Sequence, residues 1–190
     1  MRQERFSAHA TELQVWAVRV RPPLGGSLRR WLGYLVGVVI RAFTLRHGGR
    51  YSHLLLRLGD RIWEASAEGV REGEASEYRH PSLAVDVFAA PLTAEQRDHI
   101  VAWAQRIVGT PYDWSQLLRI ALAELGCPAA GLVPDGGEGR MICSEFVALA
   151  LRQAGLDLAG ETPVWRWTPD HIRTAWRRGL VELRGRLDWE

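Results

Sequence analysis

Short apolar runs separated by turn-forming residues fill the first half of the chain, a pattern typical of β-strands. The predicted strands cover residues 13–20, 52–58, 61–67, a short stretch around Val70, and 83–90. The second and third runs flank Gly59 and Asp60, a dipeptide that favours a tight turn, so we expect an antiparallel hairpin. The first strand should stop at residues 22–26 (PPLGG), because Pro and Gly favour turns.

In the second half the apolar spacing changes to three and four residues, which predicts helices. Thr93 and Gln96 match a capping box, so one helix should begin at Thr93 and end at Gly109. Residues 126–139 hold too much Gly and Pro for regular structure and should form a mobile loop. Further helices are expected over residues 27–46, from 111–114 (PYDW) onwards, over 143–154, and from 168–170 (TPD) onwards. Near the C-terminus, residues 179–185 (GLVELRG) are expected to return to the sheet.

The longest apolar stretch, residues 31–45, could form either a helix in contact with a membrane or a helix buried in the protein. Arg41 interrupts it, and a membrane-spanning helix needs about 20 apolar residues. We therefore expect a helix that is largely buried against the sheet, with Arg41 at its solvent edge. Membrane contact stays open but is not expected.

The composition fits one globular unit. The chain has 190 residues, 47% of them hydrophobic, so we expect residues 1–190 to form a single domain. Its 24 Lys and Arg nearly balance 22 Asp and Glu, and the arginines are spread along the chain. This pattern argues against a nucleic-acid-binding protein. None of these features fixes the oligomeric state.

Two cysteines exclude a framework of several disulfides and favour free thiols in a reducing compartment. The first 14 residues lack the apolar run of a secretory signal, so we expect a cytoplasmic protein, with export by another route left open. The sequence contains no HExxH, Walker or GxGxxG motif, and two cysteines cannot build a structural zinc site without several converging histidines. We expect no metal and no cofactor.

Cys143 is the strongest candidate for a reactive residue. It stands where a Gly-rich loop ends and a predicted helix begins, so the first amides of the helix point towards its sulfur. These amides favour the thiolate, and they could stabilise an oxyanion formed when the thiolate attacks a carbonyl. The alternative is an ordinary buried cysteine.

His53 and Glu64 give this cysteine a context. His53 lies near the start of a predicted strand and is followed by three leucines, so it marks the edge of the core. A cysteine at a helix N-terminus beside a histidine on a sheet is the nucleophile-base pair that thiol hydrolysis needs. Glu64 lies on the paired strand, where its carboxylate would orient the ring of His53. The alternative for Glu64 is an exposed strand residue, because the register of the hairpin is open.

Four segments occur together in the order seen in a known family: YSHLLLRLGDRIWEASAEGV (51–70), IVGTPYDW (107–114), RMICSEFVALALRQAGL (140–156) and WTPDHI (167–172). The chain resembles the circularly permuted branch of the NlpC-type papain-like superfamily, the YiiX-like and YebB-like proteins, which are related to lecithin retinol acyltransferase. The resemblance covers roughly residues 13–176, and the CSEFV helix with the SH strand is its most specific part.

The resemblance implies that the histidine strand precedes the cysteine helix, and that Cys143, His53 and Glu64 occupy the three catalytic positions. Tyr112 stands at the tyrosine of the family's GxPY motif, which lies close to the catalytic cysteine. We expect Tyr112 and Ser144 beside the substrate and the oxyanion site. A plain packing role for Tyr112 is an equal alternative.

The predicted fold is therefore α+β, a permuted papain-like fold in which an antiparallel sheet packs against a helical layer. The favoured function is a thiol hydrolase that cleaves an amide bond, in a cell-wall peptide or another amide, through an acyl-enzyme. The alternatives are a lipid-directed thioesterase, esterase or acyltransferase, and a non-catalytic binding module of the same fold. Residues 115–140 match the family only loosely, so the choice between a small peptide, amide or lipid substrate stays open.

Overall fold

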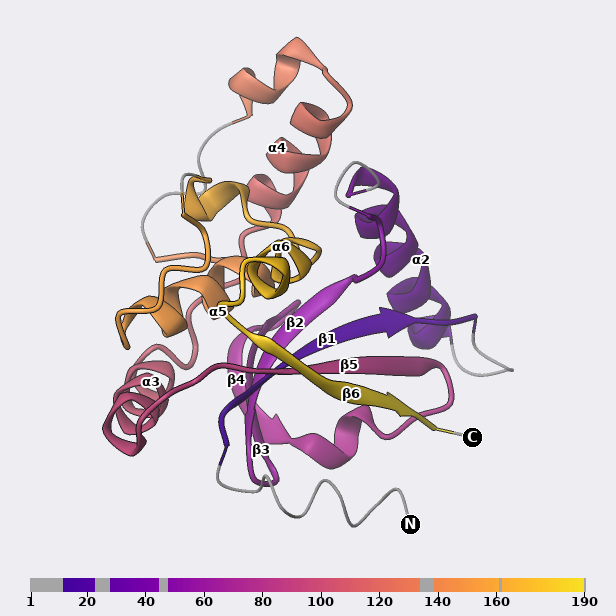
Figure 1. Ribbon diagram of the computed structural model, residues 1–190. Helices are drawn as coiled ribbons and strands as arrows, with labels where there is room; N and C mark the ends of the chain where they lie inside the picture. The colour runs from indigo at the N-terminus through magenta and orange to yellow at the C-terminus, as the bar shows by residue number, and fades with distance from the viewer. Residues whose placement is uncertain (1–11, 23–27, 45–47, 134–138, 161, 190) are drawn as a thin grey trace.

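The computed structural model describes residues 12–22, 28–44, 48–133, 139–160 and 162–189. Within these residues the centre of the fold is a six-stranded sheet with the strand order β4-β3-β2-β1-β5-β6 (Figure 1). The strands are β1 (Gln14–Val20), β2 (His53–Leu58), β3 (Arg61–Ser66), β4 (Gly69–Glu74), β5 (Leu83–Ala89) and β6 (Glu182–Asp188). All neighbouring strands are antiparallel. Every predicted strand is present, and β6 confirms that the last part of the chain returns to the sheet.

The β2–β3 hairpin confirms the predicted tight turn. Leu58 pairs with Arg61, so a two-residue loop joins the strands. Gly59 in that loop has a φ of 61°, a left-handed conformation that glycine adopts without steric cost. The turn fixes the register that places Glu64 relative to His53.

A helical layer covers one face of the sheet, which confirms the α+β class. The helices are α2 (Leu28–Phe43), α3 (Ala94–Arg106), α4 (Trp114–Glu124), α5 (Cys143–Arg152) and α6 (His171–Arg177), with the short 3-10 helices η2 (Ala75–Tyr78), η3 (Pro128–Leu132) and η4 (Val164–Arg166). Helix α5 packs on β2 and β3 through a fully buried face that includes Phe146, Val147 and Ala150. Trp103 of α3 stacks on Phe146, with ring centroids 5.7 Å apart.

The capping box predicted at the start of α3 is confirmed. The hydroxyl of Thr93 accepts a hydrogen bond from the backbone N–H of Gln96 at 3.2 Å, and the Gln96 side chain accepts one from Thr93 N–H at 2.9 Å. These two bonds satisfy amides that the helix itself leaves free. The helix ends at Arg106, three residues before the predicted end at Gly109.

Side chains alternate along β2 between the two faces of the sheet. Leu54 belongs to the core under the helical layer, whereas Leu55 belongs to a smaller apolar cluster on the opposite face together with Ile62. His53, the first residue of β2, shares the face of Leu55 and lies next to Tyr78 of η2. The start of β2 is therefore the place where a side chain from the helical layer can meet His53.

Helix α2 corrects the prediction of a largely buried segment at residues 31–45. The segment is helical and Ile40 is only 8% exposed, as predicted. However, Leu35, Val38 and Val39 are 53, 37 and 48% exposed. The physical reason is that the sequence is apolar on all sides of a helix, whereas only one side can pack against the rest of the protein.

Arg41 interrupts the apolar run of α2, but it does not lie at the solvent edge as predicted. It is half-buried, and its guanidinium donates to the carbonyl oxygens of Gly49 at 3.0 Å and Val20 at 3.4 Å. Arg41 therefore faces the body of the protein, while several apolar side chains face outward. Among the helices that the structure describes, none is long and apolar enough to cross a membrane.

The Gly- and Pro-rich segment 126–139 is partly regular. Pro128–Leu132 forms η3 where irregular structure is predicted, so that part of the prediction is wrong. A proline at the first helical position is favourable because the N–H that it lacks would have no helical partner there. Residues 134–138 lie outside the described residues, and the predicted mobility of this segment stays a prediction.

Candidate active site

Cys143 is the first residue of α5, as the sequence predicts. Ile142 precedes it without a side-chain cap, so the first amides of the helix are free for another acceptor. The backbone N–H groups of Ser144 and Leu54 donate to the Cys143 sulfur. Burial alone raises the pKa of the thiol, but the positive charge and hydrogen bond of His53, together with these amides, lower it below its usual value. The surroundings of Cys143 therefore favour a thiolate.

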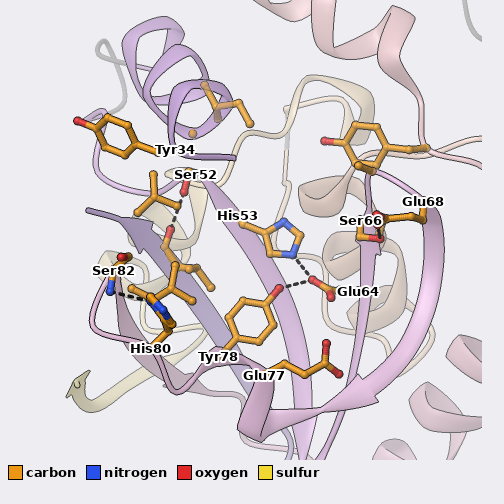
Figure 2. Close-up of a pocket in the computed structure, with 18 of the residues that line it drawn as sticks. Tyr34, Ser52, His53, Glu64, Ser66, Glu68, Glu77, Tyr78, His80 and Ser82 are labelled. Atoms are coloured by element: carbon orange, nitrogen blue, oxygen red, sulfur yellow. Dashed lines mark hydrogen bonds and ion pairs between the residues drawn. The ribbon is translucent and has the colours of Figure 1, made fainter. Parts of the chain in front are cut away.

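His53 forms a side-chain hydrogen bond with Cys143. Its Nε2 lies 2.5 Å from Oε2 of Glu64 (Figure 2), which leaves Nδ1 for the sulfur. Burial by itself lowers the pKa of His53, but the charges and hydrogen bonds of Cys143 and Glu64 outweigh burial and raise that pKa to about 10. At neutral pH the ring is therefore an imidazolium, and its charge favours the thiolate form of Cys143. The structure thus brings together the three residues that the sequence singles out.

Glu64 is buried in β3, with 1% of its surface exposed, so its alternative as an exposed strand glutamate is wrong. Besides His53, Tyr78 donates its hydroxyl to Oε2 (Figure 2), and Arg71 donates to Oε1 at 2.5 Å. Burial raises the pKa of Glu64, but the hydrogen bonds and charges of these three partners lower it to about 2. Glu64 is therefore ionised at neutral pH and stabilises the positive charge on His53.

Arg71 and Tyr78 are site residues that sequence reasoning missed. Arg71 lies directly opposite Glu64 because residues 66–69 join β3 and β4 by a two-residue loop. That tight turn is the signal from which the pairing could have been predicted. Tyr78 belongs to η2, and its ring lies parallel to the ring of His53 with centroids 6.3 Å apart. No local motif marks Tyr78, because its place depends on how η2 folds over the sheet.

Tyr112 lies beside Cys143, as the resemblance implies. It is 8% exposed, and its parallel bridge to Met141 holds the segment before α4 against the segment before α5. Its hydroxyl forms hydrogen bonds with the side chain and the backbone N–H of Cys143. Burial and the negative charge of Cys143 raise the pKa of Tyr112 well above its usual value. The hydroxyl therefore stays neutral and can donate to an anion.

Ser144 faces the site with its main chain only. Its backbone N–H donates to the Cys143 sulfur, whereas its hydroxyl donates to the carbonyl oxygen of Trp167 at 2.5 Å. The expectation of an oxyanion-adjacent residue therefore applies to the amide of Ser144 and not to its side chain. The hydroxyl instead ties α5 to the segment that precedes α6.

A cleft of about 800 Å³ opens beside His53. Figure 2 shows His53 and Glu64 in its centre, between Tyr34 and Ser52 on one side and Ser66 and Glu68 on the other. Cys143 lines a second, narrow cavity of about 20 Å³, and Tyr112 lines both spaces. Cys143 does not line the larger cleft, so Tyr112, which lines both spaces, connects the cleft with the surroundings of the sulfur.

Cys127, the second cysteine, is a half-buried free thiol that precedes η3, and Cys143 is also free. Across the ranges that the structure describes, no group of three or more His, Cys, Asp or Glu side chains is placed to hold a metal ion. The chemistry that this site offers is thus that of a thiolate, an imidazolium and hydrogen-bond donors.

No protein-family model matches the chain, and no curated protein is significantly similar to it. The geometry of the site is therefore the basis for the function proposed below.

Proposed function

We propose that this protein is a cysteine hydrolase with a permuted papain-like fold, and that it cleaves an amide bond through Cys143. The observation that carries the proposal is the unbroken chain of hydrogen bonds from Cys143 through His53 to Glu64. Three separate elements, α5, β2 and β3, converge to make it. A nucleophile, a base and a group that orients the base are the parts that acyl transfer requires.

In the proposed reaction, the thiolate of Cys143 attacks the carbonyl carbon of the amide and forms a tetrahedral intermediate. The oxyanion accepts hydrogen bonds from the hydroxyl of Tyr112 and the backbone N–H of Cys143, which bond to each other in the free site. His53 gives its proton to the leaving nitrogen as the C–N bond breaks, which leaves a thioester on Cys143. Neutral His53 then takes a proton from a water molecule that attacks the thioester, so the acid product leaves and the thiolate-imidazolium pair is restored.

The order of elements supports the permuted papain-like fold. The strand of His53 precedes the helix of Cys143 along the chain, which is the order that the resemblance implies. Helix α5 packs on β2 and β3, the two strands that carry His53 and Glu64. The helix N-terminus and the beginning of the histidine strand therefore meet at one edge of the helical layer.

Thiol labelling tests the nucleophile. In the folded protein near neutral pH, we expect iodoacetamide to alkylate Cys143 faster than Cys127, because the imidazolium and the helix amides stabilise the Cys143 thiolate. A thiol-directed activity probe should label the C127A variant as it labels the wild type, and should not label C143A. Equal alkylation of the two cysteines would contradict the assignment of Cys143.

A panel of amide and ester substrates tests the reaction. We expect turnover of at least one peptide amide by the wild type and none by C143A. Labelling of Cys143 without turnover of any amide or ester would instead favour the non-catalytic binding module.

A lipid-directed thioesterase, esterase or acyltransferase is the second candidate, and one observation favours it. Val20, Tyr34 and Ile40 form an apolar wall of the cleft beside His53. Such a wall suits an acyl chain, and the same thiolate would attack an ester or thioester carbonyl. If this candidate is right, kcat/KM should rise with the acyl-chain length of the substrate. Faster turnover of short peptide amides would favour the amidase.

A further inference from the structure

The outer side of α2 carries an apolar stripe that faces solvent. Leu35, Val38, Val39 and Ala42 follow the spacing i, i+3, i+4 and i+7, so they share one side of the helix. All four side chains are exposed, Leu35 by 53% and Val39 by 48%. This spacing is typical of a helix face that packs against apolar material, but here it points away from the core. We call these four residues the α2 stripe.

The opposite side of α2 is already engaged, so the helix cannot rotate to bury the stripe. Gly37 lies so close to β1 that a Cβ atom there would be 2.4 Å from Cγ2 of Val20. Tyr34 and Ile40, on the same inner side, line the cleft beside His53. The α2 stripe therefore lies on the outer side of a helix whose inner side lines the cleft.

A second helix adds exposed apolar surface at the same end of the molecule. Helices α2 and α4 contact each other and rise together from one end of the sheet (Figure 1). Trp114 and Leu118, one turn apart on α4, are 50 and 53% exposed. Trp114 also lines the cleft, as Tyr34 and Ile40 of α2 do.

The charge of these helices indicates what they meet. Helix α2 contains three arginines and no acidic residue, so it carries a net positive charge even though the Arg41 guanidinium bonds to carbonyl oxygens of the protein; α4 contains one arginine and one glutamate. A helix with an apolar stripe and an excess of arginine is typical of segments that lie in the headgroup region of an anionic membrane. A second copy of the same basic helix would be repelled at close range. The charges thus favour an anionic lipid surface over self-association.

We propose that the α2 stripe docks on the surface of a bilayer that contains anionic lipids, with α2 lying in the plane of the interface. The stripe side chains enter the boundary between headgroups and acyl chains, and the net positive charge of α2 is attracted to the lipid phosphates. A tryptophan such as Trp114 is well suited to this boundary. Docking would place a helix that forms part of the cleft wall at the lipid surface. This inference does not depend on the proposed hydrolase activity.

Vesicle co-sedimentation with the full chain tests the docking. We expect binding to vesicles of phosphatidylcholine with phosphatidylglycerol, weaker binding to phosphatidylcholine alone, and a decrease at high salt. The double variant L35Q/V39Q should lower partition about tenfold or more, because two apolar side chains no longer enter the interface. Both positions are exposed and glutamine favours helices, so the variant should fold, which circular dichroism would verify.

The matched control is L183Q, which changes an apolar side chain of similar exposure, 41%, on the edge strand β6. It should bind vesicles as the wild type does. C143A should also bind as the wild type, so loss of activity and loss of docking are separable. Absence of vesicle binding, or equal binding by L35Q/V39Q and wild type, would overturn the proposal. A dimer in sedimentation velocity that dissociates in L35Q/V39Q, without vesicle binding, would assign the stripe to a second copy instead.

Discussion

Glu64 sets the protonation of His53, which it contacts, and through His53 that of Cys143, which it does not contact. Its carboxylate stabilises the imidazolium of His53, and the imidazolium in turn stabilises the thiolate of Cys143. Removing the charge of Glu64 lowers the pKa of His53, so the positive charge beside the sulfur is less stable and the pKa of Cys143 rises. Loss of the Glu64 charge should therefore lower the thiolate fraction of Cys143 at neutral pH.

The variant E64Q should consequently slow the alkylation of Cys143 near neutral pH by about tenfold or more, since each pKa unit is a tenfold change in thiolate fraction. The rise of its alkylation rate with pH should lie at higher pH than the rise for the wild type, because the pKa of Cys143 is less strongly lowered in the variant. Rates of iodoacetamide alkylation across the acid and neutral range measure this shift.

The matched control is E77Q, because Glu77 also accepts a hydrogen bond from Arg71, at 2.8 Å, but is exposed. An identical pH profile for E64Q and E77Q would remove Glu64 from the proposed machinery.

At the scale of elements, one glycine controls how α2 sits on the sheet. A Cβ atom at Gly37 would lie 2.4 Å from Val20 Cγ2 and 3.3 Å from Ser52 Cβ. Ser52 adjoins His53, so pushing α2 outward would also disturb the cleft wall next to the base. The close approach explains why a helix-disfavouring residue stands in the middle of α2.

We expect G37A to lower the free energy of unfolding, although alanine favours helices. Overpacking costs about 1–3 kcal/mol, and the helix preference of alanine offsets about 1 kcal/mol of that loss. Urea unfolding followed by circular dichroism measures the difference. G131A is the matched control, because no atom lies within 4 Å of a Cβ at Gly131. A G37A protein as stable as G131A would show that the contact between α2 and β1 is loose.

At the scale of the whole molecule, local patterns predicted the elements but not all of their contacts. The tight turn at Gly59 and the capping box at Thr93 depend on nearby residues only, so the sequence was sufficient for them. The meeting of Cys143 with His53 was expected from the family resemblance, because spacing alone does not bring distant segments together. Tyr78 was missed since its position results from the packing of η2 over the sheet. The exposure of α2 was missed because its apolar residues are distributed around the whole helix, so the pattern does not reveal which side packs.

Asp170 shows how such long-range contacts support the site. The sequence predicts it at the start of a helix, and α6 does begin at the next residue, but its side chain makes no cap bond there. Its buried carboxylate instead accepts hydrogen bonds from the Thr44 hydroxyl at 3.0 Å and from the backbone N–H groups of Arg50 and Tyr51 at 3.0 and 3.3 Å. Asp170 thereby fixes the end of the loop that leads into β2, two residues before His53.

The variant D170N should therefore be destabilised and should also have a less reactive Cys143. An asparagine keeps the shape but has one acceptor oxygen, so a buried N–H loses its partner, at a cost of about 1–3 kcal/mol. Because the loop then relaxes, His53 shifts from the sulfur and alkylation of Cys143 slows at neutral pH.

D157N is the matched control. Asp157 also accepts two backbone N–H bonds, from Ala159 and Gly160, but it is exposed, so water can accept a hydrogen bond that the asparagine no longer accepts. The free energy of unfolding of D157N should fall by less than about 0.5 kcal/mol, the usual limit for surface substitutions. Urea unfolding and alkylation rates, measured on both variants, give the two readouts. A folded D170N protein that alkylates at the wild-type rate would show that this loop does not position His53.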